Sequence, residues 1–127
     1  MRTVSQSFAC QAAAVRDARR LVRDTLHGYD AELIDAAELL TSELASNCVR
    51  HARTGFEVRI SGREEVRIEV RDCGGGSPRV LSPEAHEPSG RGLLIVETVA
   101  RRWGVETRPD GKVVWFTLAR EPVATPS

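Results

Sequence analysis

Apolar residues recur at helical spacing over two long stretches near the N-terminus. Between Gln11 and Leu26 the apolar positions follow a period of about 3.6 residues, while arginines occupy the opposite side. The pair His27-Gly28 is a stop signal for this first helix. Asp30 is placed to cap a second helix that we predict to continue to about His51. The apolar stripe of that second helix comprises Leu33, Ile34, Ala37, Leu40, Leu44 and Cys48.

Elsewhere the hydrophobic pattern has a period of two, which is typical of strands. Thr3–Phe8 alternates weakly and is predicted to be an edge strand. After Gly55, two alternating runs flank the turn Ser61-Gly62-Arg63, which predicts a β-hairpin with one buried face. Near the C-terminus a further hairpin is predicted from Val105–Thr107, an Asp-Gly turn and the strand Lys112–Ala119. That last strand is apolar at nearly every position, so we expect it to be central and buried on both faces.

A third helix is predicted from about Arg91 to Trp103-Gly104, after a long loop rich in Pro, Ser, Glu and His. The order β-α-α-β-β-loop-α-β-β indicates an α+β fold of two layers. In this sandwich a mixed, mostly antiparallel sheet is covered on one face by three helices. We expect one domain over residues 1–120 and a frayed tail over residues 121–127.

Composition narrows the functional classes. The chain has 127 residues, and 18 basic residues balance 18 acidic ones, so it lacks the basic excess typical of nucleic-acid binding. It has no apolar run near the length of a membrane span and no signal peptide, so we expect a cytoplasmic protein. Three separated cysteines without a C-x-x-C pair indicate reduced thiols and not a disulfide framework or zinc site. Lys112 is the only lysine, and no Walker A phosphate loop is present.

Three segments carry candidate chemistry. On the second helix, Glu43, Asn47 and either Arg50 or His51 fall on one side, at i, i+4 and i+7 or i+8. Oxygen ligands suit Mg²⁺ and a cation suits phosphate, although the same spacing also describes an ordinary surface network.

The other two segments are rich in glycine. Asp72 ends a strand and is followed by Cys73-Gly74-Gly75-Gly76, where a flat ligand could approach the backbone and Asp72 could accept a hydrogen bond from an exocyclic amine. A glycine-rich turn is the alternative. Ser89-Gly90-Arg91-Gly92 precedes the third predicted helix and could offer N–H groups to a phosphate. Taken alone, it is a weak signal.

In this order and spacing, the three segments resemble the N box and the two glycine boxes of the GHKL (histidine-kinase-like) ATPase superfamily. The closer resemblance is to small bacterial anti-sigma factor serine/threonine kinases and their stand-alone actinobacterial relatives. It rests on Glu43–Ala52, Asp72–Gly76, Gly90–Val96 and the closing strand Val113–Leu118, and extends over about Val4–Ala119.

The resemblance implies a histidine-kinase-like ATPase fold, ATP and Mg²⁺ as ligands, and a role for each matching residue. Asn47 would coordinate Mg²⁺ and Glu43 would act as general base. Asp72 would bind the adenine amine. Arg50 would contact phosphate and His51 the ribose or adenine. The other implied contacts are Gly74 and Gly76 at the adenine, Gly90, Arg91, Gly92 and Leu93 at the phosphates, a lid over Ser77–Ser89, and Thr117 backing the adenine contact through water.

By resemblance, the expected function is an ATP-dependent protein serine/threonine kinase that phosphorylates an anti-sigma factor antagonist and acts as an anti-sigma factor in transcription regulation. The alternative is a binding module that holds ATP, or nothing, and sequesters a partner such as a sigma factor. The arginines at 16, 19, 20 and 23 would then be a contact surface or simply a solvated helix face. A DNA-binding regulator is disfavoured by the neutral charge. No nucleic-acid or membrane partner is expected, and the sequence leaves open whether the chain forms a homodimer.

Overall fold

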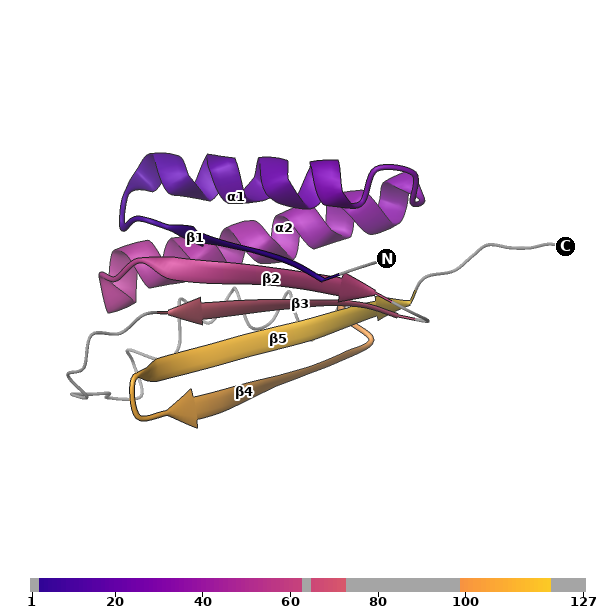
Figure 1. The fold of residues 1–127 in the computed structure, drawn as a ribbon. Coiled ribbons are helices and arrows are strands. Elements are labelled where there is room, and N and C mark those ends of the chain that lie inside the picture. The colour runs from indigo at the N-terminus through magenta and orange to yellow at the C-terminus, as the bar shows by residue number, and fades with distance from the viewer. Residues whose placement is uncertain (1–2, 63–64, 73–98, 120–127) are drawn as a thin grey trace, which may run out of the picture.

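The computed structural model describes residues 3–62, 65–72 and 99–119 of the chain. Its elements are β1 (Val4–Phe8), α1 (Ala12–Thr25), α2 (Ala31–Asn47), the π-helical turn η1 (Cys48–Ala52), β2 (Phe56–Gly62), β3 (Glu65–Asp72), β4 (Arg102–Arg108) and β5 (Gly111–Ala119). Two layers are visible in Figure 1, with α1 and α2 lying over one face of the sheet. No described helix is both long enough and apolar enough to cross a membrane.

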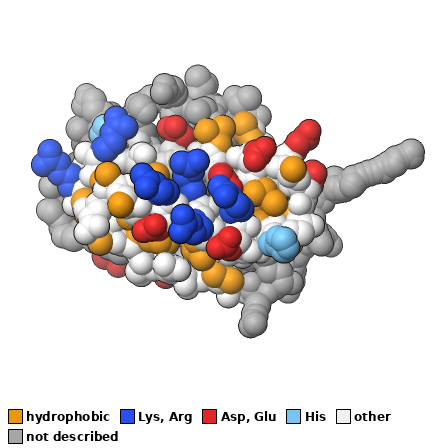
Figure 2. All heavy atoms as spheres, turned by 90° about the horizontal axis from the view of Figure 1, so that it is seen from above, with side chains coloured by type: hydrophobic (Ala, Val, Ile, Leu, Met, Phe, Trp, Pro, Cys, Tyr) orange, Lys and Arg blue, Asp and Glu red, His pale blue; other side chains and the backbone are white. Residues whose placement is uncertain are grey.

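The helix layer follows the predicted apolar periodicity. On α1, Ala14, Ala18 and Val22 are buried, and the arginines face solvent (Figure 2). On α2 the buried positions include Leu33, Ala37, Leu40 and Leu44. α1 ends at Thr25, with Leu26 as its C-cap, and the link to α2 contains Gly28 at φ +100°, a conformation that glycine adopts readily. Asp30 stands at the N-cap position of α2 as predicted, but its side chain makes no capping hydrogen bond.

The five described strands form one sheet in the order β1-β2-β3-β5-β4, and each neighbouring pair is antiparallel. The predicted edge strand at the N-terminus and the predicted hairpin of β2 and β3 are therefore confirmed, but Ser61 and Gly62, which were predicted to lie in the turn, belong to β2 and pair with Arg67 and Val66. The closing strand β5 lies between β3 and β4, so its central position is confirmed as well.

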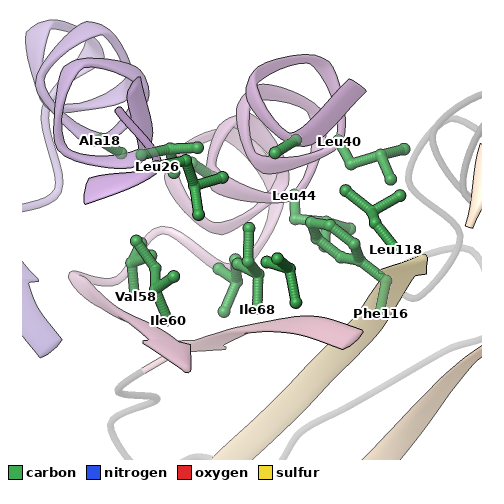
Figure 3. Packing of buried hydrophobic residues seen from close by; sticks show 14 of the residues in the cluster. Ala18, Leu26, Leu40, Leu44, Val58, Ile60, Ile68, Phe116 and Leu118 are labelled. Atoms are coloured by element: carbon green, nitrogen blue, oxygen red, sulfur yellow. The ribbon is translucent and has the colours of Figure 1, made fainter. Parts of the chain in front are cut away.

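Strand alternation divides the sheet into two faces. The inner face, under the helices, carries apolar side chains that are at most 5% exposed: Phe56, Val58, Ile60, Val66, Ile68, Val70, Phe116 and Leu118. Figure 3 shows Val58, Ile60, Ile68, Phe116 and Leu118 directed toward the two helices. The outer face carries mainly charged residues, such as Arg67, Glu69 and Arg71 on β3. On β5, Val113 and Thr117 lie on this outer face and are each only 2% exposed. The expectation that β5 is shielded on both faces therefore holds at these positions.

Two sequence expectations need correction in the C-terminal half. The third helix was expected to reach Trp103-Gly104, but both residues belong to β4, in register with Phe116 and Trp115 of β5. Pairing already begins at Arg101, whose N–H donates to the carbonyl of Thr117 at 2.8 Å. These sheet hydrogen bonds override the helical periodicity of the preceding residues. Most of the predicted third helix lies outside the described residues, and within them there are two α-helices where three were expected for the whole chain.

The turn between β4 and β5 is also displaced from its expected place. Arg108 pairs with Gly111, so the two turn residues are Pro109 and Asp110 and not Asp110-Gly111. The pyrrolidine ring holds φ of Pro109 near −65°, which excludes the turn types that need a positive φ at the first central position. The positive φ, +152°, falls on Gly111, the first residue of β5.

Candidate functional site

Asp72 ends β3 and is held in place by the start of β5. Its side chain is on the inner face, in register with Phe56 of β2, and the residue is 8% exposed. The backbone N–H of Lys112 donates to Oδ1 of Asp72 at 3.2 Å. The β4–β5 hairpin therefore orients this carboxylate at the end of the sheet, as a specific hydrogen-bond acceptor requires.

Gly111 allows that close approach. A Cβ atom built at this position would lie 2.4 Å from the carbonyl oxygen of Asp72 and 2.6 Å from its Oδ1. The sequence interpretation did not assign Gly111 or Lys112 to the site. The sequence does contain a glycine directly after the Pro-Asp turn. Its contact with Asp72 could not be predicted, because that contact depends on which strand pairs with β3.

The second helix points toward the same end of the sheet. In Figure 3, Leu40 lies near Leu118 and Leu44 lies near Phe116, so α2 advances along β5 toward Lys112 and along β3 toward Asp72. A second set of contacts agrees. Phe8, Phe56 and Asp72 occupy one register row, and Cys10, two residues beyond Phe8, directs its thiol to the carbonyl oxygen of Val49 at 3.8 Å. The C-terminal turn of α2 and Asp72 thus lie at one end of the molecule.

Glu43 and Asn47 are one turn apart near this end of α2, and both side chains are half-buried. At i and i+4 they share one side of the helix. The buried residues Thr41 and Ala45 lie on another side of the helix. A carboxylate and an amide are thereby placed at the border between core and solvent, where they could contact both a bound ligand and a reacting group.

The π-helical turn after Asn47 places the two candidate cations, Arg50 and His51, at different positions relative to the row of Glu43 and Asn47. Turn η1 has a bond from the N–H of Arg53 to the carbonyl of Cys48, and it closes with Arg53 at φ +56°. A turn with i→i+5 bonds holds more residues than an α-turn, so each residue rotates through a smaller angle. Four residues beyond Asn47, His51 returns to the row of Glu43 and Asn47, whereas Arg50 stops short of it. Both residues are exposed.

Thr117 does not join this group. On β5 it pairs with Arg67, five residues before Asp72 on β3, which corresponds to about 17 Å along the strand. It also lies on the outer face, whereas Asp72 lies on the inner face. The structure therefore separates Thr117 from the expected adenine contact. The cause is strand register, which the position of a residue in the sequence does not reveal.

The remaining predicted contacts, namely Gly74, Gly76, Gly90, Arg91, Gly92, Leu93 and the lid Ser77–Ser89, lie outside the described residues. Within the described ranges there is no group of three or more His, Cys, Asp and Glu residues that could hold a metal ion. Mg²⁺ at nucleotide sites is typically held by one or two protein oxygens together with substrate phosphates and waters. The half-buried amide oxygen of Asn47, one turn from Glu43, fits that limited protein contribution.

Comparison with known proteins gives a family and a fold. The model of the family described as "Histidine kinase-like ATPase domain" matches residues 8–118. Among solved structures, the RsbU and RsbW domains of Rv1364c from Mycobacterium tuberculosis match with a TM-score of 0.76 and 19% identity over 100% of this chain and 35% of that one. The present chain thus spans about a third of the length of that solved chain.

Two histidine kinases are similar at lower scores. Histidine kinase AdeS of Acinetobacter baumannii matches with a TM-score of 0.55 and 13% identity, over 96% of this chain and 70% of that one. The catalytic domain of histidine kinase ThkA, in a nucleotide-free form, matches with a TM-score of 0.52 and 16% identity, over 98% and 99% of the two chains. At these identities the structural matches show a shared fold.

Proposed function

The chain belongs to the histidine kinase-like ATPase family, and from this membership we propose that it is an ATP-dependent serine/threonine kinase acting on an anti-sigma factor antagonist. The observation that carries the proposal is the placement of Asp72. Its carboxylate is buried and held by the Lys112 amide, at the end of the sheet toward which α2 directs Glu43 and Asn47. The similarity to a structure containing an RsbW domain supports a regulatory setting.

Each residue has one task in the proposed reaction. Asp72 accepts a hydrogen bond from the adenine amine. The amide oxygen of Asn47 would coordinate Mg²⁺, and the bound ion would neutralise phosphate charge. Glu43 takes the proton of the attacking serine or threonine hydroxyl as the oxygen of that hydroxyl bonds to the γ-phosphorus. The bond from the γ-phosphorus to the bridging oxygen breaks, and ADP leaves. His51, in the row of Glu43 and Asn47, contacts the ribose or adenine.

Nucleotide binding is tested by titrating the purified chain with ATP in a calorimeter, with and without Mg²⁺. We expect saturable binding that weakens at least about tenfold in Asp72→Asn, because the amide cannot replace both acceptor oxygens. In Asn47→Ala we expect the difference between ATP with and without Mg²⁺ to shrink. Absence of saturable heat with the parent chain would overturn the nucleotide assignment.

Catalysis is tested separately with labelled ATP and a purified antagonist protein. Glu43→Gln should bind Mg-ATP like the parent and transfer phosphate at least about a hundredfold more slowly, since general-base catalysis contributes on that order. Glu32→Gln is the matched control, because Glu32 is an exposed carboxylate in the first turn of the same helix. Equal transfer rates for Glu43→Gln and the parent would contradict the base assignment.

A second candidate function is a non-catalytic module that binds ATP and sequesters its partner, including a sigma factor. The observation in its favour is a set of four exposed arginines on α1, of which Arg23 alone has a carboxylate partner among the described residues. Binding of ATP and of a sigma factor without any phosphate transfer by the parent chain would favour this function over the kinase.

A further inference from the structure

Charged side chains are arranged differently on the two outer surfaces of the molecule. On the outer face of the sheet and its margin, five arginines have a glutamate oxygen within 4.0 Å: Arg67, Arg71, Arg101, Arg102 and Arg108. On α1, the four exposed arginines are Arg16, Arg19, Arg20 and Arg23. Of these four, only Arg23 has a carboxylate partner within the described residues, Glu38 at 2.8 Å.

The α1 arginines form a narrow stripe. At i, i+4 and i+7, Arg16, Arg20 and Arg23 form one row about 10 Å long. Arg19 flanks the row on one side, and the acidic residues of α1, Asp17 and Asp24, lie on the other side. Figure 2 shows the basic side chains gathered at the centre of the helix layer, with acidic ones around them.

Folding alone does not favour this arrangement. Arg16 and Arg20 are like charges at i and i+4, as are Arg19 and Arg23, and such pairs destabilise a helix. Asp17 and Asp24, at i−3 and i+4 from Arg20, offset part of this repulsion, but neither Arg16 nor Arg19 has an acidic residue three or four positions away on α1. A solvated helix face does not require four like charges within eight residues.

We propose that this arginine stripe is the docking surface for an acidic helix of a protein partner. The inference rests on the proposed function in taking that partner to be a regulatory protein. A helix with carboxylates at i, i+4 and i+7 presents them over the same 10 Å or so, and the planar guanidinium group can bind a carboxylate through two parallel hydrogen bonds. The partner would thus bind the helix layer while the nucleotide occupies the end of the sheet.

Other polyanions fit the stripe less well. A nucleic-acid surface needs basic charge along a phosphate backbone, whereas this row is only about 10 Å long and has Asp17 and Asp24 at its flank. A membrane-binding helix buries its apolar side in lipid, but the apolar side of α1, with Ala14, Ala18 and Val22, is already buried within the protein.

The test uses the full chain and two labelled helical peptides of identical composition. One peptide carries three glutamates in a row at i, i+4 and i+7, and the other distributes them around the helix. By fluorescence anisotropy at about 50 mM salt, we expect the row peptide to bind about tenfold more tightly than its isomer. Arg16→Glu/Arg20→Glu should abolish this difference. Arg59→Glu, an exposed arginine of β2 without an ion pair in the described part, is the matched control and should preserve it.

Folding of each variant is verified by circular dichroism. If Arg16→Glu/Arg20→Glu does not fold, Arg16→Gln/Arg20→Gln replaces it in the same measurement. Equal or absent binding of the two peptides would overturn the proposal. So would tighter binding, by the same arginines, of a DNA duplex or of phosphatidylserine vesicles. The proposed docking surface and the proposed kinase function can be tested independently of each other. Arg16→Glu/Arg20→Glu should bind Mg-ATP like the parent, and Asn47→Ala should bind the row peptide like the parent.

Discussion

The two faces of the sheet are built from the same strands but obey different physical rules. Along β3, Val66, Ile68 and Val70 point into the core and are at most 2% exposed, whereas the intervening Arg67 and Glu69 form an ion pair at 2.9 Å on the outer face. The inner face is stabilised by the exclusion of water and by close packing. The outer face is stabilised by pairs of charges that solvent screens.

The difference between the two faces predicts which substitutions cost little stability and which cost much. Each inner residue fills a volume that no neighbour can replace, so its truncation leaves a cavity. Each outer charge takes part in an exposed contact of small energy, so a single loss is modest. Between these extremes lies Trp115, which is on the outer face but packs on the backbone of Gly104 and under the guanidinium of Arg67 at 4.3 Å.

The largest expected effect is on the inner face. Phe116→Ala removes one of the largest fully buried side chains and should lower the free energy of unfolding by about 3–5 kcal/mol. Denaturant unfolding measures the change. Val105→Ala, at an edge-strand position that is 45% exposed, is the control and should cost much less. Similar losses for both variants would break the contrast between core and surface.

An intermediate effect is expected where the outer face is most closely packed. A Cβ atom at Gly104 would lie 2.7 Å from the ring of Trp115, so Gly104→Ala must displace the indole. We expect a loss of about 1–3 kcal/mol, the usual cost of overpacking. The loss should be smaller when the same change is made in a Trp115→Ala background, which a double-mutant cycle measures. Additive losses would show that the indole is not the obstacle.

The smallest effect is expected at Glu65, and it depends on pH. The hydrogen bond from Arg102, at 2.8 Å, with the nearby Arg101, holds the pKa of the Glu65 carboxyl below its ordinary value of 4.5. A lowered pKa in the folded state contributes stability above the ordinary pKa, and this contribution is lost as the pH falls through the folded value.

Glu65→Gln should therefore lower the melting temperature slightly near neutral pH, and the difference from the parent should vanish as the pH falls below 4.5. Thermal melts followed by circular dichroism over that range provide the measurement. The difference should also shrink in high salt, because the partners Arg101 and Arg102 are exposed. A difference that grows toward acid would contradict the sign of the pKa shift.

Much of the fold can be predicted from local patterns. The apolar spacing of α1 and α2 and the alternation in β2 and β3 specify both the elements and the faces that they bury. The boundary at Arg102 could not be predicted in this way. Residues there can follow a helical pattern, and only the hydrogen bonds to β5 turn them into a strand.

The candidate site is predictable in part for the same reason. Glu43 and Asn47 are one helical turn apart, a relation that sequence spacing contains, and Asp72 ends an obvious strand. Thr117 was misplaced because its face and level depend on the β3–β5 register. The π-helical turn that contains Arg50 and His51 has no propensity signal, and it depends on how the chain leaves α2 to enter β2.

Gly111 is required by two features of the structure, the β4–β5 hairpin and the position of Asp72. Its φ of +152° suits the start of the strand after the hairpin, and the lack of a side chain leaves room for Asp72. Asparagine, which often replaces glycine in left-handed turns, would collide with the Asp72 backbone here. A substitution of Gly111 would therefore have two unfavourable effects: it would strain the backbone of the hairpin, and it would displace the carboxylate of Asp72. Replacing Asp72 would remove only part of the second effect, because the atom closest to a Cβ at position 111 is the backbone carbonyl oxygen of residue 72.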